Sequence, residues 1–215
     1  MPANKRNGNR KNRENRVPFR TPQLGYYLIV TDTKETEKNY MIGLREAIPT
    51  HLRDKLVIKV KSTKTKNLVD EAKSLAALHP QYGEPWIIFD RDQVKDFDQI
   101  ISKAENECVN VGWSNPCIEI WFSAYFGTMP TYRDSIKCCS EFAKKFTDII
   151  KSDYVKADNN IYNLLCAHGD EECAIGIAER KLKQQCELCE KPSDMCPATT
   201  MHILVEEIKS KIKSN

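Results

Sequence analysis

Carboxylates directly follow two apolar segments that have the composition of buried strands. Residues 26–31 (YYLIVT) lead into Asp32, and residues 86–89 (WIIF) lead into Asp90 and Asp92. Because strand side chains alternate with a period of two, Asp90 and Asp92 should leave the second strand on the same side. The carboxyl ends of parallel strands meet at one edge of a sheet, where such folds bind ligands. We therefore expect Asp32 to converge with this pair.

Two further acids are candidates for the same site. Glu37 lies one turn further along, in the helix expected after Asp32. Glu119 lies in the apolar segment 118–122 (IEIWF), which follows a Ser-Asn-Pro helix-start signal. A carboxylate is costly to bury among apolar side chains unless it has a partner or a metal. Several carboxylates in one place also repel each other, which raises their pKa values unless a cation neutralises them.

A hard divalent cation suits such a set of oxygen ligands. Mg²⁺ or Mn²⁺ is expected at Asp90, Asp92 and Asp32, because carboxylate sites that retain water favour these ions. Such an ion can polarise a phosphoryl oxygen, activate water and stabilise a leaving oxygen, so the set favours phosphodiester hydrolysis. The alternative for Asp92 is structural, since aspartate often caps helices and a helix is expected from Val94.

Basic residues are concentrated in the first 20 positions. This Asn-rich arm carries seven Lys and Arg against one acid, Glu14, and the other 26 basic and 29 acidic residues give a net charge of −3. A disordered basic arm can add a salt-sensitive attraction to nucleic acid, although the alternative is a solvated tail. The candidate nucleic-acid contacts are Arg10, Lys11, Arg13, Arg16, Arg20 and, between the two acids of the pair, Arg91.

Neither a membrane span nor an export signal is expected. No apolar run approaches the ~20 residues that cross a bilayer. The first residues are polar and basic, without the apolar stretch of a secretory signal, which predicts a cytoplasmic protein. The nine cysteines are then expected to be reduced thiols or ligands rather than disulfides, with Cys138, Cys139 and Cys166 in the core.

The alternation of elements predicts an α/β fold with a small, four-stranded, mainly parallel sheet flanked by helices and a helical C-terminal half. We expect a disordered arm over 1–22, an α/β core over 23–115 and a helical part over 116–215 that completes the same domain. The expected strands are 26–31, 56–60, 86–89 and 109–113. The expected helices are 37–47, 65–79, 94–108, 118–126, 132–151, 161–167, 173–189 and 200–213.

Five blocks of the chain, in order, resemble one family. They are YLIVTDTKETEKNY, IIFDRDQ, SNPCIEIWFSAYF, the tripeptide Tyr154-Val155-Lys156, and PATTMHILV at 197–205. On these blocks the chain resembles the RloB-like proteins, which include the abortive-infection protein AbiLii and are regarded as a branch of the TOPRIM fold. The resemblance runs from about residue 24 to residue 208 and implies a TOPRIM-like sheet.

The resemblance also implies roles for individual residues. Asp90 and Asp92 match the metal-binding pair, and Asp32 matches a further ligand or proton-transfer acid. Thr36, Glu37 and Tyr40 match a Thr-Glu-x-x-Tyr continuation, Glu119 matches the acid of the Asn-Pro-x-x-Glu block, and Lys156 matches a lysine that could stabilise a phosphate oxygen. The implied activity is that of a Mg²⁺-dependent nuclease acting on RNA, including transfer RNA, or on DNA. It would be an effector of antiphage defence beside an ABC-type (RloA-like) ATPase partner.

Several positions depart from the family pattern. Asp32-Thr33 replaces a usual Glu-Gly, Glu35 replaces a common lysine, and Tyr125 stands where histidine is frequent. Aspartate is one methylene shorter than glutamate, and threonine adopts positive φ less readily than glycine. These departures leave open a second function, a catalytically degenerate TOPRIM domain that binds nucleic acid or a partner ATPase without cleavage.

A third function class rests on the C-terminal cysteines. Cys186, Cys189 and Cys196, with His202 beyond them, have the ligand types of a zinc site that would stabilise a helical interaction module. Their spacing is not that of two paired Cys-x-x-Cys motifs. The alternative is three reduced cysteines in a loop.

Overall fold

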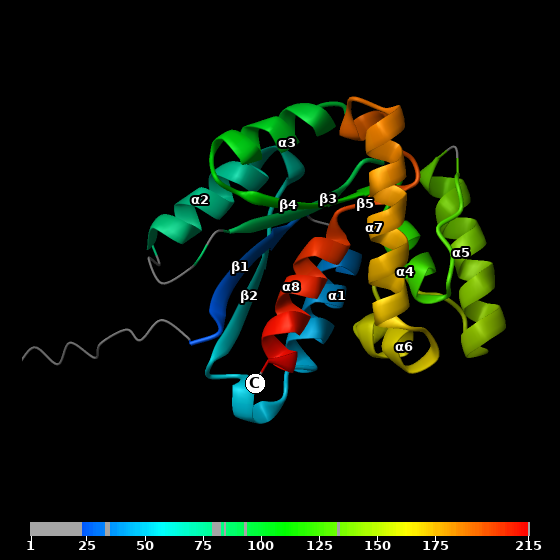
Figure 1. The fold of residues 1–215 in the computed structure, drawn as a ribbon, viewed down its shortest axis with the longest axis horizontal. Helices are drawn as coiled ribbons and strands as arrows, with labels where there is room; N and C mark the ends of the chain where they lie inside the picture. The colour runs from blue at the N-terminus through cyan, green and yellow to red at the C-terminus, as the bar shows by residue number, and fades with distance from the viewer. Residues whose placement is uncertain are drawn as a thin grey trace, which may run out of the picture.

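The computed structural model describes residues 23–32, 35–78, 83, 85–92, 94–132 and 134–214. A twisted sheet lies at its centre, with strand order β2-β1-β3-β4-β5 (Figure 1). The strands are β1 (Gly25–Thr31), β2 (Leu56–Ser62), β3 (Trp86–Asp90), β4 (Asn110–Asn115) and β5 (Ala198–Thr199). β1 to β4 are parallel, as the sequence predicted.

The fifth strand corrects the predicted fold. Four strands were expected, but Ala198 and Thr199 pair antiparallel with Asn115 and Ser114 at the end of β4. Two residues are too short for a period of two to be recognised in the sequence. β5 therefore brings the C-terminal half of the chain to the edge of the sheet, beside the Ser-Asn-Pro block.

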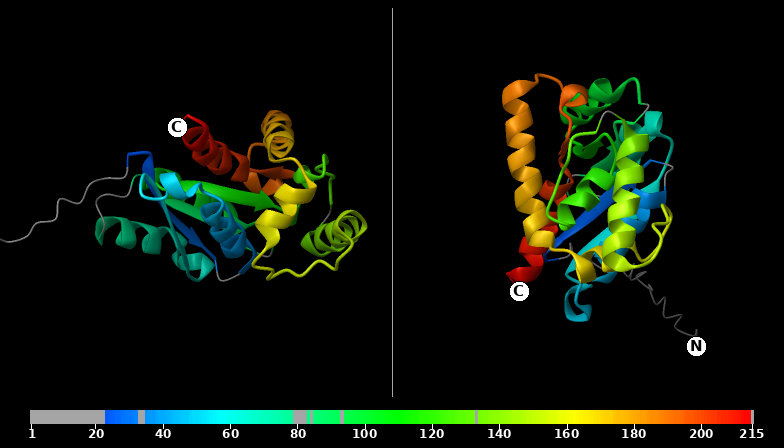
Figure 2. Two further views of the ribbon diagram at one scale, coloured as in Figure 1. Left: turned by 90° about the horizontal axis from the view of Figure 1, so that it is seen from below. Right: turned by 90° about the vertical axis from the view of Figure 1, so that its right-hand side faces the viewer.

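Helices cover both faces of the sheet, which explains the continuous apolar strands. Leu28 and Val30 face the layer of α2 (Leu68–Leu78) and α3 (Phe97–Asn106). Tyr27 and Ile29 face the opposite layer, where α1 (Glu35–Glu46) and α8 (Met201–Lys213) pack (Figures 1 and 2). All five residues of β3 are buried. The central strands are thus closed to solvent on both sides, whereas the edge strand β2 is partly exposed.

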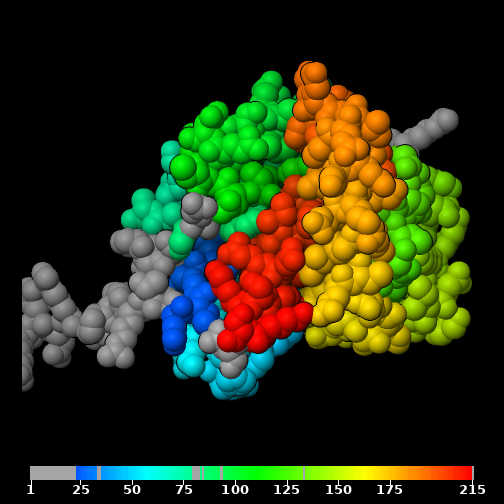
Figure 3. Space-filling model, viewed as in Figure 1, coloured from blue at the N-terminus to red at the C-terminus, as the bar shows by residue number. Residues whose placement is uncertain are grey.

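The C-terminal half is helical, as predicted, apart from β5. It contains α4 (Glu119–Tyr125), α5 (Ser135–Ile150), α6 (Ile161–His168) and α7 (Glu171–Leu188) before α8. α4 is buried along its whole length, and α5 and α7 run along either side of it (Figure 2). α7 and α8 lie side by side on one face of the molecule (Figure 3). Short 3₁₀ turns occupy Thr50–Leu52, Thr65–Asn67 and Pro192–Asp194.

Three predictions drawn from composition concern the basic arm, membrane spans and the cysteines. The basic arm, with Arg10, Lys11, Arg13, Arg16 and Arg20, lies outside the described residues. Among the helices of the described part, none is long and apolar enough to span a bilayer. All nine cysteines are free thiols. Cys138 is buried and Cys139 is half-buried, but the core position predicted for Cys166 is wrong, because this residue is exposed on α6.

His202, at the start of α8, is buried, and its Nδ1 lies 3.0 Å from the Thr199 carbonyl oxygen. Burial lowers the pKa of this imidazole, so the folded chain holds it neutral. The unfolded chain takes up a proton near pH 6.5. The unfolded state therefore binds more protons below that pH, and stability should be lost as the pH falls.

We predict that the free energy of unfolding, measured by urea denaturation, decreases between about pH 7.5 and pH 5.5. His202→Gln should flatten that pH dependence, because glutamine does not titrate. The exposed His168 is the matched control, and His168→Gln should keep the wild-type slope. An unchanged slope in His202→Gln would contradict the assignment.

Candidate functional site

Two acids flank the point at which the strand order reverses. β2 lies on one side of β1, whereas β3 and β4 lie on the other, so the crevice at the carboxyl ends of β1 and β3 is where such sheets bind ligands. Asp32 directly follows β1, and Asp90 is the last residue of β3. Each is only 4% exposed, and the Asp32 amide donates to the Ile88 carbonyl at 3.2 Å. Both acids therefore lie at the predicted edge.

The register of β1 and β3 sends the two carboxylates toward opposite layers. Thr31 pairs with Ile88, so Asp32 is level with Phe89 and not with Asp90. Paired residues face the same side of a sheet and successive residues face opposite sides. In agreement, Asp32 Oδ2 lies 3.5 Å from the hydroxyl of Thr65, just before α2. Asp32 thus approaches the edge from the α2 side and Asp90 from the α1 side.

The acids line an open edge rather than a closed cage. Among the described residues, no three of the predicted acids have carboxylate oxygens all within 4.8 Å of one another. The close convergence expected of Asp32, Asp90 and Asp92 is therefore not seen. The donors that remain at the edge are all hard oxygen atoms, which suit a hydrated divalent ion.

Asp92 is half-buried beside β4. Its amide donates to the Pro116 carbonyl at 2.9 Å, and its Oδ1 accepts from the hydroxyl of Ser135 at the start of α5. It lines a pocket of about 470 Å³ together with Asn115 and Ser135. The helix-cap alternative for Asp92 is wrong, because α3 begins only at Phe97. Asp92, which follows β3, instead contacts α5 through Ser135 and lines the pocket.

Arg91, predicted to contact nucleic acid, is already engaged within the protein. Its Nη1 donates to the Val94 carbonyl at 2.8 Å, and its guanidinium carbon lies 5.8 Å from the centre of the Phe97 ring. It nevertheless lines the same pocket as Asp92. Its positive charge is therefore fixed beside that opening.

Glu119 is the first residue of α4, and its side chain contacts the Tyr154–Lys156 segment. It is 1% exposed, and its Oε1 accepts from the Tyr154 hydroxyl at 3.1 Å and lies 3.6 Å from Lys156 Nζ. A carboxylate in the first turn is also favoured by the helix dipole. Burial is the largest single effect on the Lys156 amine and lowers its pKa, but the charge of Glu119 and the neighbouring Cys139 and Cys117 together outweigh burial and raise the pKa of Lys156. The Lys156 side chain is 59% exposed, so this cation can reach a ligand.

The start of α1 fixes the same segment from the other side. The Thr36 hydroxyl donates to the Lys156 carbonyl at 2.6 Å, and Asn39 Nδ2 donates to the Ala157 carbonyl at 2.9 Å. Glu37, between them, is 1% exposed. Blocks that are more than a hundred residues apart in the sequence thus meet beside the edge. Asn39 was not predicted as part of this contact, and no periodicity marks it.

A model of the RloB-like protein family matches residues 27–208. The chain belongs to the RloB-like protein family. The matched residues run from β1 into α8 and include every acid described above. No curated protein and no solved structure matches the chain.

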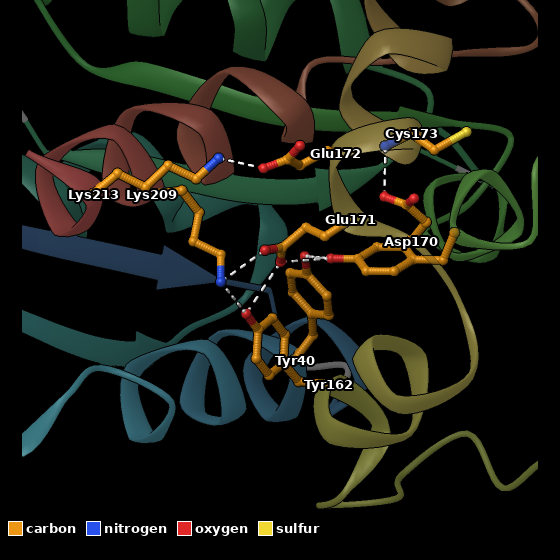
Figure 4. A network of polar contacts seen from close by, with 9 residues as sticks. Tyr40, Tyr162, Asp170, Glu171, Glu172, Cys173, Lys209 and Lys213 are labelled. Carbon is orange, nitrogen blue, oxygen red and sulfur yellow. Dashed lines mark hydrogen bonds and ion pairs between the residues drawn. The ribbon is translucent and has the colours of Figure 1, made fainter.

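In this RloB-like protein, Tyr125 contacts a buried polar network that includes Tyr40 and Glu171, two of the residues labelled in Figure 4. Its hydroxyl lies 2.7 Å from that of Tyr40 and donates to Glu171 at 3.0 Å. Tyr162 donates to the same carboxylate at 3.1 Å, and Lys209 lies 2.7 Å from its other oxygen. Burial raises the pKa of Tyr125 well above its usual value, so it stays protonated. Tyr125 therefore holds helices together rather than serving the sheet edge.

The start of α7 lies beside this network. Asp170 caps the helix by accepting from the Cys173 amide at 2.9 Å, and Glu172 pairs with Lys213 at the end of α8 (Figure 4). Glu171, between them, points inward. Nothing in the sequence singles out Glu171, because its partners come from helices far away along the chain.

The RloB-like structure does not bring the C-terminal cysteines together. Cys186 contacts the Met195 sulfur at 4.0 Å, Cys189 approaches the Asp194 carbonyl at 3.6 Å, and Cys196 approaches the Tyr132 carbonyl at 3.3 Å. Within the described part of the chain, these thiols do not form a group with sulfurs within 4.8 Å of one another. The arrangement fits three reduced cysteines better than a zinc site.

Proposed function

We propose that this RloB-like protein is a metal-dependent nuclease that hydrolyses phosphodiester bonds in RNA, including transfer RNA, or in DNA. One observation carries the proposal: two nearly buried carboxylates, Asp32 and Asp90, end neighbouring strands at the switch point of the sheet. Carboxylates at the ligand-binding edge of such a sheet offer the hard oxygen donors that a divalent cation takes.

The residues at the edge fit Mg²⁺ or Mn²⁺. Asp90 and Asp92 would hold the ion, with Asp32 contributing from the other side of the edge, and each offers the hard oxygen donors that these ions require. When bound, the ion would polarise the phosphoryl group and lower the pKa of a water molecule. We further propose that the sheet is a variant of the TOPRIM fold.

Other residues of the chain would neutralise phosphate charge, transfer protons and attract nucleic acid. Lys156, a half-exposed cation steadied by Glu119, would neutralise charge on a phosphate oxygen. Glu119 would orient Lys156, while Asp32 or Glu37 would accept or return a proton. The basic arm and Arg91 would attract the phosphate backbone in a salt-dependent manner. In this proposal the protein is an effector of antiphage defence that an ABC-type ATPase controls.

A second candidate function is binding without cleavage, and the position of Asp32 favours it. The shorter aspartate approaches Thr65 on the α2 side, away from Asp90. An acid placed there would contribute less to a shared ion than the glutamate usual in the family. In that case the domain would bind nucleic acid or the partner ATPase and leave it intact.

A cleavage assay separates these two functions. Labelled transfer RNA, single-stranded RNA and plasmid DNA are each incubated with the purified protein in Mg²⁺, in Mn²⁺ or in chelator. Cleavage of one substrate class in metal, and none in chelator, is the expected result. Cleavage that persists in chelator would contradict the proposal. Tight binding without cleavage under all conditions would favour the second function.

A further inference from the structure

Two thiols and a carboxylate form a compact cluster where the start of α4 meets α5. The sulfurs of Cys117 and Cys139 lie 3.7 Å apart, and a Glu119 carboxylate oxygen lies within 4.8 Å of both. In the part of the chain that the structure describes, this is the one group of three metal-ligating side chains so close together. Cys117 and Glu119 are buried, and Cys139 is half-buried.

The spacing of the sulfurs is that of two ligands on one ion. Zinc bonds thiolate sulfur at about 2.3 Å in a tetrahedral arrangement, so two sulfurs on the same ion stand about 3.8 Å apart. A disulfide would instead require about 2.05 Å. The separation of 3.7 Å, at which one thiol can donate to the other when no ion is bound, is compatible with shared coordination of one ion.

Well-fixed elements hold the three ligands. Cys117 lies two residues before Glu119, at the entry to α4, and Cys139 projects from the second turn of α5. α5 is anchored at its start, where Asp134 accepts from the Lys137 amide and Ser135 donates to Asp92. Ligands on fixed helices need little reorganisation when an ion arrives.

Glu119 supplies an independent indication of a ligand. Its Oε1 is occupied by Tyr154 and lies 3.6 Å from Lys156, but Oε2 is buried and accepts no hydrogen bond from the residues that the structure describes. Buried acceptors are normally satisfied, so such an oxygen calls for an explanation such as a bound ion. This oxygen belongs to the carboxylate that completes the cluster.

We propose that Cys117, Cys139 and Glu119 form a site for a thiophilic divalent cation, with Zn²⁺ as the best match. Two thiolates and a carboxylate are zinc ligands, and three protein ligands leave a fourth position for water. Thiolates select against Mg²⁺, so this site is chemically separate from the aspartate edge.

Co²⁺ titration under reducing conditions tests this site, with Co²⁺ as the probe and Zn²⁺ as the competitor. We expect one Co²⁺ per chain to produce a thiolate-to-metal charge-transfer band and tetrahedral ligand-field bands that Zn²⁺ abolishes. Cys117→Ser and Cys139→Ser should each lose the charge-transfer band. Glu119→Gln should weaken the affinity by at least the roughly 10- to 100-fold that loss of a second-shell partner costs.

Matched variants and a second measurement keep the test independent of folding defects. Cys173→Ser, at an exposed thiol, should bind as wild type does. The same result is expected for the triple variant Cys186→Ser, Cys189→Ser, Cys196→Ser. X-ray absorption of the Zn²⁺-bound wild type should count two sulfur ligands with oxygen completing the shell. No band in the reduced wild type, or a band that persists without Cys117 and Cys139, would overturn the proposal. Because no nucleic acid is involved, the outcome is independent of nuclease activity.

Discussion

Asp90→Asn should reduce metal-dependent cleavage by about 10²- to 10⁴-fold, equivalent to the several kcal/mol that a bound metal ion contributes to catalysis. Asparagine has nearly the same shape as aspartate and keeps one oxygen donor, but it lacks the negative charge that holds a divalent ion. Asp90 ends β3 and is 4% exposed, so the strand fixes where its side chain meets the edge of the sheet. The measurement is the initial rate of cleavage at saturating Mg²⁺ for the substrate that the wild type cleaves.

Two comparisons show whether the loss arises from the metal. Asp54→Asn removes an exposed acid just before β2, at the opposite end of the sheet, and should keep wild-type activity. Mg²⁺ should raise the melting temperature of the wild type and of Asp54→Asn, because ligands that bind only the folded state stabilise it. It should not stabilise Asp90→Asn. Undiminished metal-dependent cleavage by a folded Asp90→Asn protein would show that the ion is held elsewhere.

The parallel sheet could be predicted because its strands carry local signals. Apolar runs bounded by charge mark β1 to β4, and the apolar spacing between them marks the helices within a few residues. β5 carries no such signal. Ala198 and Thr199 are placed by pairing with a strand more than 80 residues earlier, and two residues have no periodicity to read. The pairing of β5 with β4 is non-local, so it could not be predicted from the sequence alone.

Local sequence signals also predict only part of the candidate site. That Asp32 and Asp90 reach one edge follows from where each strand ends, which is local information. The side from which each carboxylate arrives depends on the register of β1 against β3, and Thr31 pairs with Ile88. A shift of one residue would have put both acids on one side. The interpretation of the departure at Asp32 therefore depends on a pairing that only the structure supplies.

The interpretation of Tyr125 changed once its contacts in the structure were known. In the sequence it stands where histidine is frequent in the family and suggests a lost base. In the structure its hydroxyl contacts Tyr40 and Glu171 within the helical core. A buried carboxylate with several hydroxyl donors is strongly coupled to them, so loss of one donor disturbs the others. In this chain Tyr125 thus contributes to the packing of the helical core.

Gly43→Ala should destabilise the fold by about 2–3 kcal/mol, through overpacking and through disturbed hydrogen bonds. A Cβ atom at this position of α1 would lie 2.5 Å from Cβ of Tyr162 on α6. Both atoms are attached directly to the backbone, so neither can rotate away and the two helices must separate. That movement would also pull Tyr162 from Glu171. Urea denaturation, with the midpoint and slope compared to wild type, measures the loss.

Gly176→Ala makes the same chemical change on α7, but it should increase the free energy of unfolding instead of decreasing it. The nearest atom to a Cβ there is Arg180 Nη1 at 3.7 Å, which is ordinary contact with a flexible side chain. Alanine is preferred to glycine within a helix by about 0.8–1.0 kcal/mol, so this variant should be more stable than wild type. The helix preference is equal at both positions, so the difference between the variants isolates the contact of α1 with α6. If both substitutions stabilised the protein, Gly43 could not lie against Tyr162, and the core that joins α1 to the Glu171 network would have to be packed differently.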